Sequence, residues 1–201
     1  MENASVSIPN LSTRWAADEF VIRPLASADI PNVRALHAEL APSFPALRPT
    51  FFHQLLTHQT HLCLIATLPS SDKPVACIAT ALHVSTSDLT SRAALPAPID
   101  VRVLALGVLP AFRRRGLATR LLRTAAASLP VLAANAPQLP TSLITPKSPT
   151  RVCVDVARAD RSSREFWNHV GMREESSPRH EPWVVGWRDV VSVAGPVLSA
   201  A

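Results

Sequence analysis

The stretch from residue 99 to residue 129 constrains the fold most, because the spacing of its apolar residues changes from that of a strand to that of a helix. Residues 101–108 form a nearly continuous apolar run, which is typical of a strand buried on both faces, and Pro110 ends it. After Gly116 the apolar residues recur at helical spacing, at Leu117, Leu121, Leu122 and Ala125. The sequence predicts a strand, a basic turn and the N-terminus of a helix.

The turn has the features of an anion-binding site. The first N–H groups of a helix have no partner inside the helix, and they point to where the helix dipole is positive. Gly116 and Ala118 leave the backbone open to a ligand, and Thr119 adds a hydroxyl. Three consecutive arginines at 113–115 add positive charge. An ordinary basic loop before a helix is the alternative interpretation.

Two segments resemble one known family, the GCN5-related N-acetyltransferases. Arg113-x-x-Gly116-x-Ala118 resembles the acetyl-CoA motif of that family, which reads Q/R-x-x-G-x-G/A at a strand-to-helix turn. DRSSREFWNHVGM, which starts at Asp160, resembles the family segment N-x-x-A-x-x-F-Y-x-x-x-G-F. The resemblance covers roughly residues 19–190. It implies an α/β (α+β) fold with a mixed, mostly antiparallel seven-stranded sheet, splayed middle strands and helices on both faces.

The resemblance also implies acetyl-CoA as the cofactor. In the family, the amides of the turn bind the CoA pyrophosphate, and a bulged, splayed strand before the turn hydrogen-bonds the pantetheine arm. Gly107 is then the expected bulge residue. The cofactor contacts implied by the resemblance are Leu106, Gly107, Val108, Arg113, Arg114, Arg115, Gly116, Leu117, Ala118, Thr119, Asp160, Ser163 and Trp167.

The catalytic residues depart from the nearest relatives. The chain is most similar to N-alpha-acetyltransferases of the NatE (San) type, which use a Tyr and a His, with ordered water, as the base. This chain contains no tyrosine. The position that corresponds to the family Tyr is occupied by Arg102, and the position that corresponds to the family His is occupied by Asp155. We expect Asp155 to act as the base through water, with Arg102 facing it across neighbouring strands. A purely structural ion pair is the alternative, and His83, His169 and His180 are expected to be surface residues.

The acceptor is implied by another resemblance. LHAELAPSFP followed by FFHQLL resembles the loop with which San-type enzymes receive a substrate N-terminus, which implies peptide-facing roles for Pro42 and Phe44. Leu104, on the strand before the basic turn, is also assigned to the substrate. The implied reaction is direct acetyl transfer, in a ternary complex, to the N-terminal amine of nascent, Met-starting polypeptides, with the NatA complex and the ribosome as partners. A weak or inactive subunit of that assembly, and an enzyme that acetylates lysine or small amines, remain as alternatives.

Composition and charge limit the domain organisation, the cellular location and the kinds of ligand that we expect. The chain has 201 residues, 47% of them hydrophobic, and we expect a flexible arm (1–18), one domain (19–190) and a tail (191–201).

The sequence has no signal-peptide pattern and no apolar run that approaches about 20 residues. We therefore expect a soluble, cytoplasmic protein without membrane contact. The net charge of +5 suits an anionic cofactor or a polyanionic surface; sequence-specific nucleic-acid binding is not expected. No metal site is expected, because Cys63, Cys77 and Cys153 lack ligand spacing and should be buried.

The other expected elements follow from the spacing of apolar residues and from the residues that cap helices or form turns. Strands are expected over 19–25, 61–68, 75–84, 151–157 and 182–191. Ser27 is expected to cap the first helix, Asp160 is expected to cap the last one, and Gly171 is expected to end it. The segment from Pro130 to Thr150, which holds five prolines, is expected to be a surface insertion.

Overall fold

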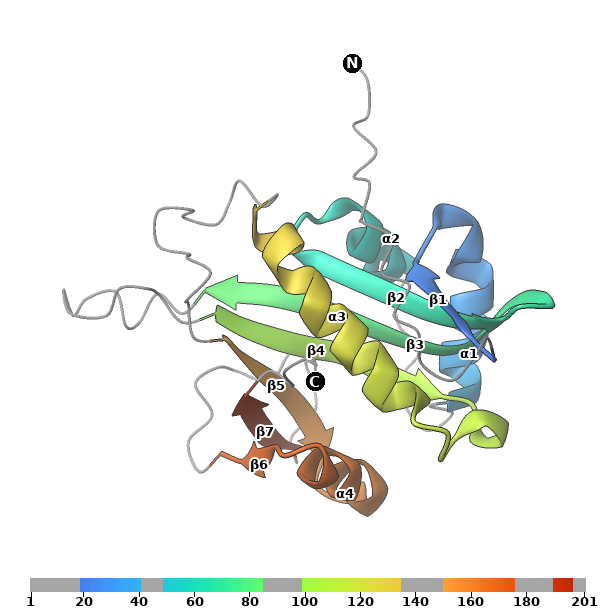
Figure 1. Cartoon of the computed structure of the whole chain (residues 1–201). Coiled ribbons are helices and arrows are strands. Elements are labelled where there is room, and N and C mark those ends of the chain that lie inside the picture. The colour runs from blue at the N-terminus through green and yellow to red at the C-terminus, as the bar shows by residue number, and fades with distance from the viewer. Residues whose placement is uncertain (1–18, 41–48, 85–98, 135–149, 176–189, 197–201) are drawn as a thin grey trace.

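A single mixed sheet organises the computed structural model, which describes residues 19–40, 49–84, 99–134, 150–175 and 190–196. The elements are, in order, β1 (Val21–Pro24), the 3-10 turn η1 (Ser27–Asp29), α1 (Ile30–Leu40), α2 (Pro49–Thr57), β2 (His61–Leu68), β3 (Ser71–Val84), β4 (Ile99–Val108), the 3-10 turn η3 (Pro110–Phe112), α3 (Leu117–Ala134), β5 (Thr150–Ala157), α4 (Arg161–His169), β6 (Arg173–Glu174) and β7 (Val190–Pro196). Figure 1 shows the sheet with α3 crossing its front.

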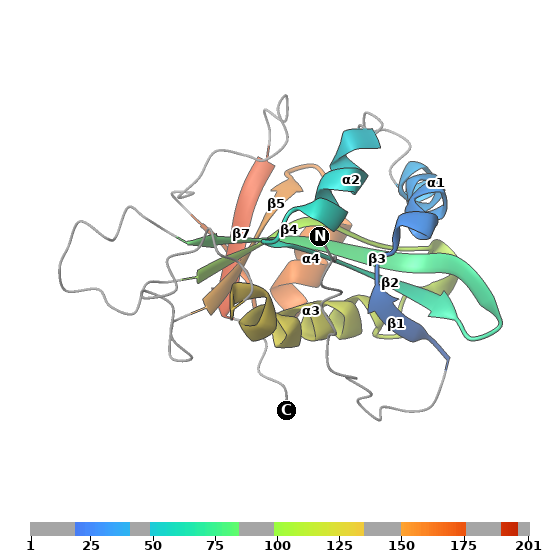
Figure 2. The same cartoon turned by 90° about the horizontal axis from the view of Figure 1, so that it is seen from above.

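The sheet confirms the expected fold class. In the described residues its seven strands lie in the order β1-β2-β3-β4-β5-β7-β6. Neighbouring strands are antiparallel except β4 and β5, which are parallel. Figure 2 shows α1 and α2 on one face of the sheet and α3 and α4 on the other. The strand expected at 61–68 and its hairpin partner are β2 and β3.

Each face of the sheet has its own core. On one face the leucines of α3 and Trp167 of α4 pack on alternate residues of β2, β3, β4, β5 and β7. On the other face the apolar stripe of α1 and the phenylalanines of α2 pack on β2 and β3. The expectation of buried cysteines is confirmed, because Cys63, Cys77 and Cys153 are all buried and free. Among the described helices, none is long and apolar enough to span a membrane.

The entry into α1 differs from the expected serine cap. Ala26 stands at the N-cap of η1, and Ser27 is the first residue inside that turn. The carboxylate of Asp29 accepts the N–H of Ala26 at 2.9 Å and receives two hydrogen bonds from Arg23, at 2.6 and 2.9 Å. The expected role of Ser27 is wrong because Asp29, held in place by Arg23, satisfies the free N–H at the chain entry instead.

Two expected boundaries are also wrong. Helix α3 continues through Pro130 to Ala134, and Ala133 is buried in the core; this packing offsets the helical hydrogen bond that a proline removes. The last strand is Val190–Pro196, so residues 192–196 are not part of a frayed tail, and Val191 and Val193 are buried in the same core. Residues 135–149 and 182–189 lie outside the described part of the chain.

The pairing of Arg23 with Asp29 should make stability depend on pH. Hydrogen bonding from Arg23 lowers the pKa of the Asp29 carboxyl below its usual value of 3.8. Its stabilising contribution is therefore complete above the unfolded-state pKa and is lost as pH falls through the lower folded-state pKa. We expect Asp29→Asn to lower the free energy of unfolding by about 1–3 kcal/mol at neutral pH.

Denaturant unfolding at two pH values tests this. The difference between wild type and Asp29→Asn should shrink as the pH falls through the lowered pKa of Asp29, because the wild-type carboxyl then becomes protonated too. Arg23→Gln should lose stability with the same pH dependence, since it removes the other half of the pair. A difference that is equally large at neutral and acidic pH would contradict the assignment.

Candidate active site

The middle of the sheet opens where β4 and β5 part. Their parallel ladder ends at the pair Val103 and Val154, although β4 continues to Val108 and β5 to Ala157. Beyond that pair, the N–H and C=O groups of β4 that point away from β3 face the side that β5 has left. The splayed middle strands expected from the sequence are therefore confirmed, and the open edge of β4 can hydrogen-bond an extended ligand.

A bulge lies at the same place, but not at the expected residue. Ala79 pairs with Ala105 and Thr80 with Val103, so within the β3–β4 ladder Leu104 is the extra residue. Gly107 pairs regularly with Cys77, and its expected role as the bulge is wrong. A Cβ at position 107 would lie 2.4 Å from the Cδ1 atom of Leu40, so a larger residue there would require the Leu40 side chain of α1 to move.

The turn before α3 presents free amides to an anion. Arg114 and Gly116 both have left-handed backbones, with φ of 65° and 71°, and α3 begins at the next residue, Leu117. The N–H of Arg120 donates to the carbonyl of Gly116 at 2.9 Å, which leaves the amides of residues 117–119 without a helical acceptor. Such alternation of backbone conformations before a helix forms an anion-binding concavity. The predicted strand, turn and helix start are confirmed.

The three arginines of the turn have different surroundings. The Nε atom of Arg113 donates to the carbonyl of Val108 at 2.9 Å, which ties the turn to the end of β4. Arg115 forms an ion pair with Glu19 and lies over the ring of Phe112, 5.7 Å from its centroid. Arg114 is exposed and has no hydrogen bond or ion pair in the described part of the chain. Arg114 is therefore free to meet an anionic ligand.

The start of α4 is closed by its own side chains. The carboxylate of Asp160 accepts hydrogen bonds from the N–H and the hydroxyl of Ser163, at 3.0 and 2.6 Å, so the expected cap is confirmed. Gly171, with φ of 90°, ends the helix as expected. Trp167 is buried in the core and packs edge-on against Phe166. The cofactor contacts assigned to Asp160, Ser163 and Trp167 remain predictions.

The two residues assigned to catalysis lie on neighbouring strands, on one face of the sheet. Arg102 pairs with Cys153 in the parallel ladder, and Asp155 follows two residues later on β5, just beyond the last pair and next to the bulge. The Oδ1 atom of Asp155 accepts a hydrogen bond from the Ser192 hydroxyl at 2.8 Å, across the β5–β7 ladder. Ser192 is buried, and the sequence interpretation missed it because it was assigned to the tail.

The remaining candidate residues are three histidines and three substrate residues. His83 and His169 are exposed, as expected, whereas His180 and the substrate residues Pro42 and Phe44 lie outside the described residues. Leu104, the third substrate residue, is the bulge residue and is partly buried against the core under α1 and α2. Its contact with a substrate stays a prediction.

Buried thiols near the site are unsuited to carry an acyl group. Burial raises the pKa of Cys153 to about 12 and that of Cys77 to about 12, and it raises the pKa of Cys63 as well. At neutral pH all three are thiols, whereas the nucleophile in acyl transfer is a thiolate. No group of three or more His, Cys, Asp or Glu residues among those described could hold a metal ion.

On the same face of the sheet, three charged residues form a partly buried network. Arg151 contacts Asp100 at 2.6 Å and Glu175 at 2.5 Å. The hydrogen bonds that Arg151 donates to Asp100 are the largest cause that raises the pKa of Arg151. Since Asp100 and Arg151 are opposite each other at the start of the β4–β5 ladder, the network fixes the two strands together below the point where they part.

Residues 33–133 match the family model described as Acetyltransferase (GNAT) family. The chain belongs to this family. It is therefore an acetyl-CoA-dependent N-acetyltransferase, with acetyl-CoA as its cofactor. A search of curated protein sequences found no match.

Solved structures share the fold over nearly their whole length. The ribosomal-protein-S18-alanine N-acetyltransferase of Escherichia coli has 16% identity and a TM-score of 0.58, over 90% of this chain and 96% of that one. Arabidopsis thaliana NAA60 in complex with acetyl-CoA has 15% identity and a TM-score of 0.61, over 89% and 99%. Arabidopsis thaliana Naa50 in complex with the bisubstrate analogue CoA-Ac-MVNAL has 14% identity and a TM-score of 0.55, over 88% and 98%. At these identities the likeness establishes the fold.

The described residues of the GNAT chain fit the cofactor. The free amides of residues 117–119 and the exposed Arg114 would hold the pyrophosphate, because both are donors at the positive end of a helix. The open edge of β4 from Leu104 to Val108 would hold the pantetheine arm, which has amide groups spaced along an extended chain. Acetyl-CoA supplies the activated thioester.

The left-handed backbone of Gly116 gives a prediction with a built-in control. An alanine there would meet no atom within 4 Å, and the same is true of Gly171, which also has a positive φ. Both Gly116→Ala and Gly171→Ala should therefore lower the free energy of unfolding by about 1–2 kcal/mol, through backbone strain alone.

Only Gly116→Ala should affect the cofactor, because Gly171 ends α4 away from the turn. We expect it to weaken CoA binding by about tenfold, measured by titration calorimetry, since the strained turn no longer aligns its amides. Equal loss of CoA affinity in the two variants would show that the turn does not bind the phosphates.

Proposed function

We propose that this enzyme acetylates the N-terminal amine of polypeptides. The observation that carries the proposal is the position of Asp155, a partly buried carboxylate at the point where β4 and β5 part, beside the edge assigned to the pantetheine arm. An acyl acceptor amine must lose a proton at that point. The polypeptide acceptor is supported by the sequence resemblance to San-type enzymes. It is also supported by fold relatives such as Naa50 in complex with the bisubstrate analogue CoA-Ac-MVNAL and the NatC complex bound to Gag peptide and CoA.

Asp155 acts as the general base in this proposal. Its carboxylate would take a proton from the substrate ammonium through a water molecule. Acetyl-CoA would supply the thioester, whose C–S bond breaks as the acetyl group passes to the neutral amine, with CoA leaving as the thiol. Ser192 orients the carboxylate through its 2.8 Å hydrogen bond. Arg102, on the same face one strand away, balances its charge. The strand edge from Leu104 to Val108 holds the acetyl group in place, so the base need not be strong.

The same resemblance supports a wider assignment. The proposal places the enzyme in the cytoplasm, with the NatA complex and the ribosome as partners and with Met-starting nascent chains as substrates. Pro42 and Phe44 would contact the substrate N-terminus, together with Leu104. A catalytically inactive subunit, and an enzyme for lysine or small amines, are the two competing functions.

Activity profiling separates the three functions. Purified protein is incubated with acetyl-CoA and with three kinds of acceptor: Met-starting peptides with a free α-amine, the same peptides blocked at the N-terminus but containing lysine, and polyamines. We expect mass spectrometry to find acetyl groups on the free α-amines only. Faster acetylation of lysine or polyamine would contradict the N-terminal assignment, and no product despite CoA binding would identify an inactive subunit.

Asp155→Asn tests the base. We expect turnover to fall well over tenfold, within the range of about 10²–10⁴ that a general base contributes, while CoA affinity changes less than about twofold. Asp72→Asn, at an exposed position of the β2–β3 hairpin, is the control for loss of one negative charge and should retain full turnover. Ser192→Ala should reduce turnover less than Asp155→Asn, because it only positions the carboxylate. Unchanged turnover in Asp155→Asn would rule out the base assignment.

A further inference from the structure

Arg115, the third arginine of the turn, is paired with a glutamate that precedes the edge strand β1. Glu19 lies just before β1 and forms an ion pair with Arg115, and the two side chains are 49% and 47% exposed. The guanidinium of Arg115 also lies over the ring of Phe112. Phe20, the residue after Glu19, packs edge-on against that ring, with 5.9 Å between centroids and an interplanar angle of 83°. Residues 19 and 20 therefore contact the turn together.

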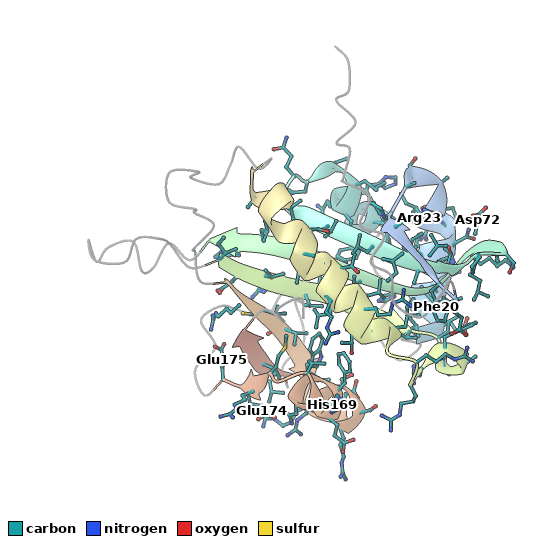
Figure 3. The ribbon with its side chains drawn as sticks, viewed as in Figure 1. Phe20, Arg23, Asp72, His169, Glu174 and Glu175 are labelled. Atoms are coloured by element: carbon teal, nitrogen blue, oxygen red, sulfur yellow. The ribbon has the colours of Figure 1, made fainter. Side chains whose placement is uncertain are left out.

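The ion pair ties Arg115 to the chain just before β1, on the side of β4 opposite β5. In the sheet order, β1 is separated from β4 by β2 and β3, whereas β5 is on the other side of β4. Glu19 belongs to the β1 side, and Figure 3 labels Phe20 at the end of β1 nearest the turn. Arg115 is thus held by Glu19, whereas Arg114 is exposed and remains available to a ligand at the free amides of residues 117–119.

The turn is electrostatically unfavourable without an anion. Three arginines stand at the positive end of α3, and the first turn of that helix has no acidic residue. In the described part of the chain, Glu19 is the acid that pairs with this cluster. Exposed ion pairs are weak and exchange readily, whereas a phosphate offers an arginine two charge-assisted hydrogen bonds.

We propose that Glu19 is an internal counter-ion of the acetyl-CoA site. In the free enzyme its carboxylate neutralises Arg115, and on binding it gives Arg115 up to a phosphate of acetyl-CoA. Glu19 thus competes with the cofactor and lowers its affinity. The packing of Phe20 on Phe112 is apolar and does not depend on the carboxylate, so Glu19→Gln removes the competing charge but keeps the turn supported.

The test measures CoA affinity by titration calorimetry at low and high salt. Glu19→Gln should bind CoA about 2–5-fold more tightly than wild type at low ionic strength, the range expected for release of one exposed ion pair, and the gain should disappear at about 1 M salt. The matched control is Glu174→Gln, which breaks the Arg164–Glu174 pair at the opposite edge of the sheet, with exposures of 43% and 37%. It makes the same charge change and should leave CoA affinity unchanged.

A double-mutant cycle shows whether the effect acts through Arg115. Arg115→Gln should weaken CoA binding, and Glu19→Gln added to it should have no further effect. Thermal melting of each free variant confirms that it is folded, and Glu19→Lys, which reverses the charge, should give a larger gain than Glu19→Gln. Weaker binding by Glu19→Gln, or the same gain with and without Arg115, would overturn the proposal.

Discussion

The early end of the ladder between β4 and β5 is the constraint on which the site depends. Each strand keeps a full partner on its other side, because β3 follows β4 to Val108 and β7 follows β5 to Ala157. The sheet therefore opens in its middle without losing either strand, and the backbone groups of one edge of β4 become available to a ligand. The bulge at Leu104 is in the same place, since a bulge increases local twist and re-aims the strand. The cofactor turn continues from one of the parted strands and the assigned base lies on the other.

Helix α1 is fixed at both of its ends, and both contacts concern the site. At its start, Asp29 is held by Arg23 of β1. At its end, Leu40 packs directly on Gly107 of β4, where no larger residue would fit without displacing it. The C-terminal end of α1 is therefore held beside the open edge of β4.

Features governed by neighbouring residues could be predicted from the sequence, and those governed by distant contacts could not. The start of α3 after Gly116, the cap formed by Asp160 and the end of α4 at Gly171 are each set within one helical turn, so these local features are predicted correctly. Ser27 failed as a cap because Arg23, on a different element, holds Asp29 instead. Pro130 ends no helix because core packing beyond it outweighs the lost hydrogen bond. The role of Gly107 depends on Leu40, which is far away in the chain, and no local pattern shows that contact.

The strained and like-charged turn bears on whether the chain binds its cofactor at all. Arg114 holds a left-handed backbone, which is unfavourable for any residue with a side chain, and it stands among cations at the positive end of a helix. Backbone strain and repulsion between cations would only destabilise a purely structural loop. A bound diphosphate would offset both through hydrogen bonds from the amides and the arginines. Cofactor binding alone does not distinguish an active enzyme from an inactive subunit that still binds acetyl-CoA. In the proposed mechanism, the carboxylate of Asp155 would distinguish catalysis from binding; it accepts a hydrogen bond from the buried Ser192, where the two middle strands part.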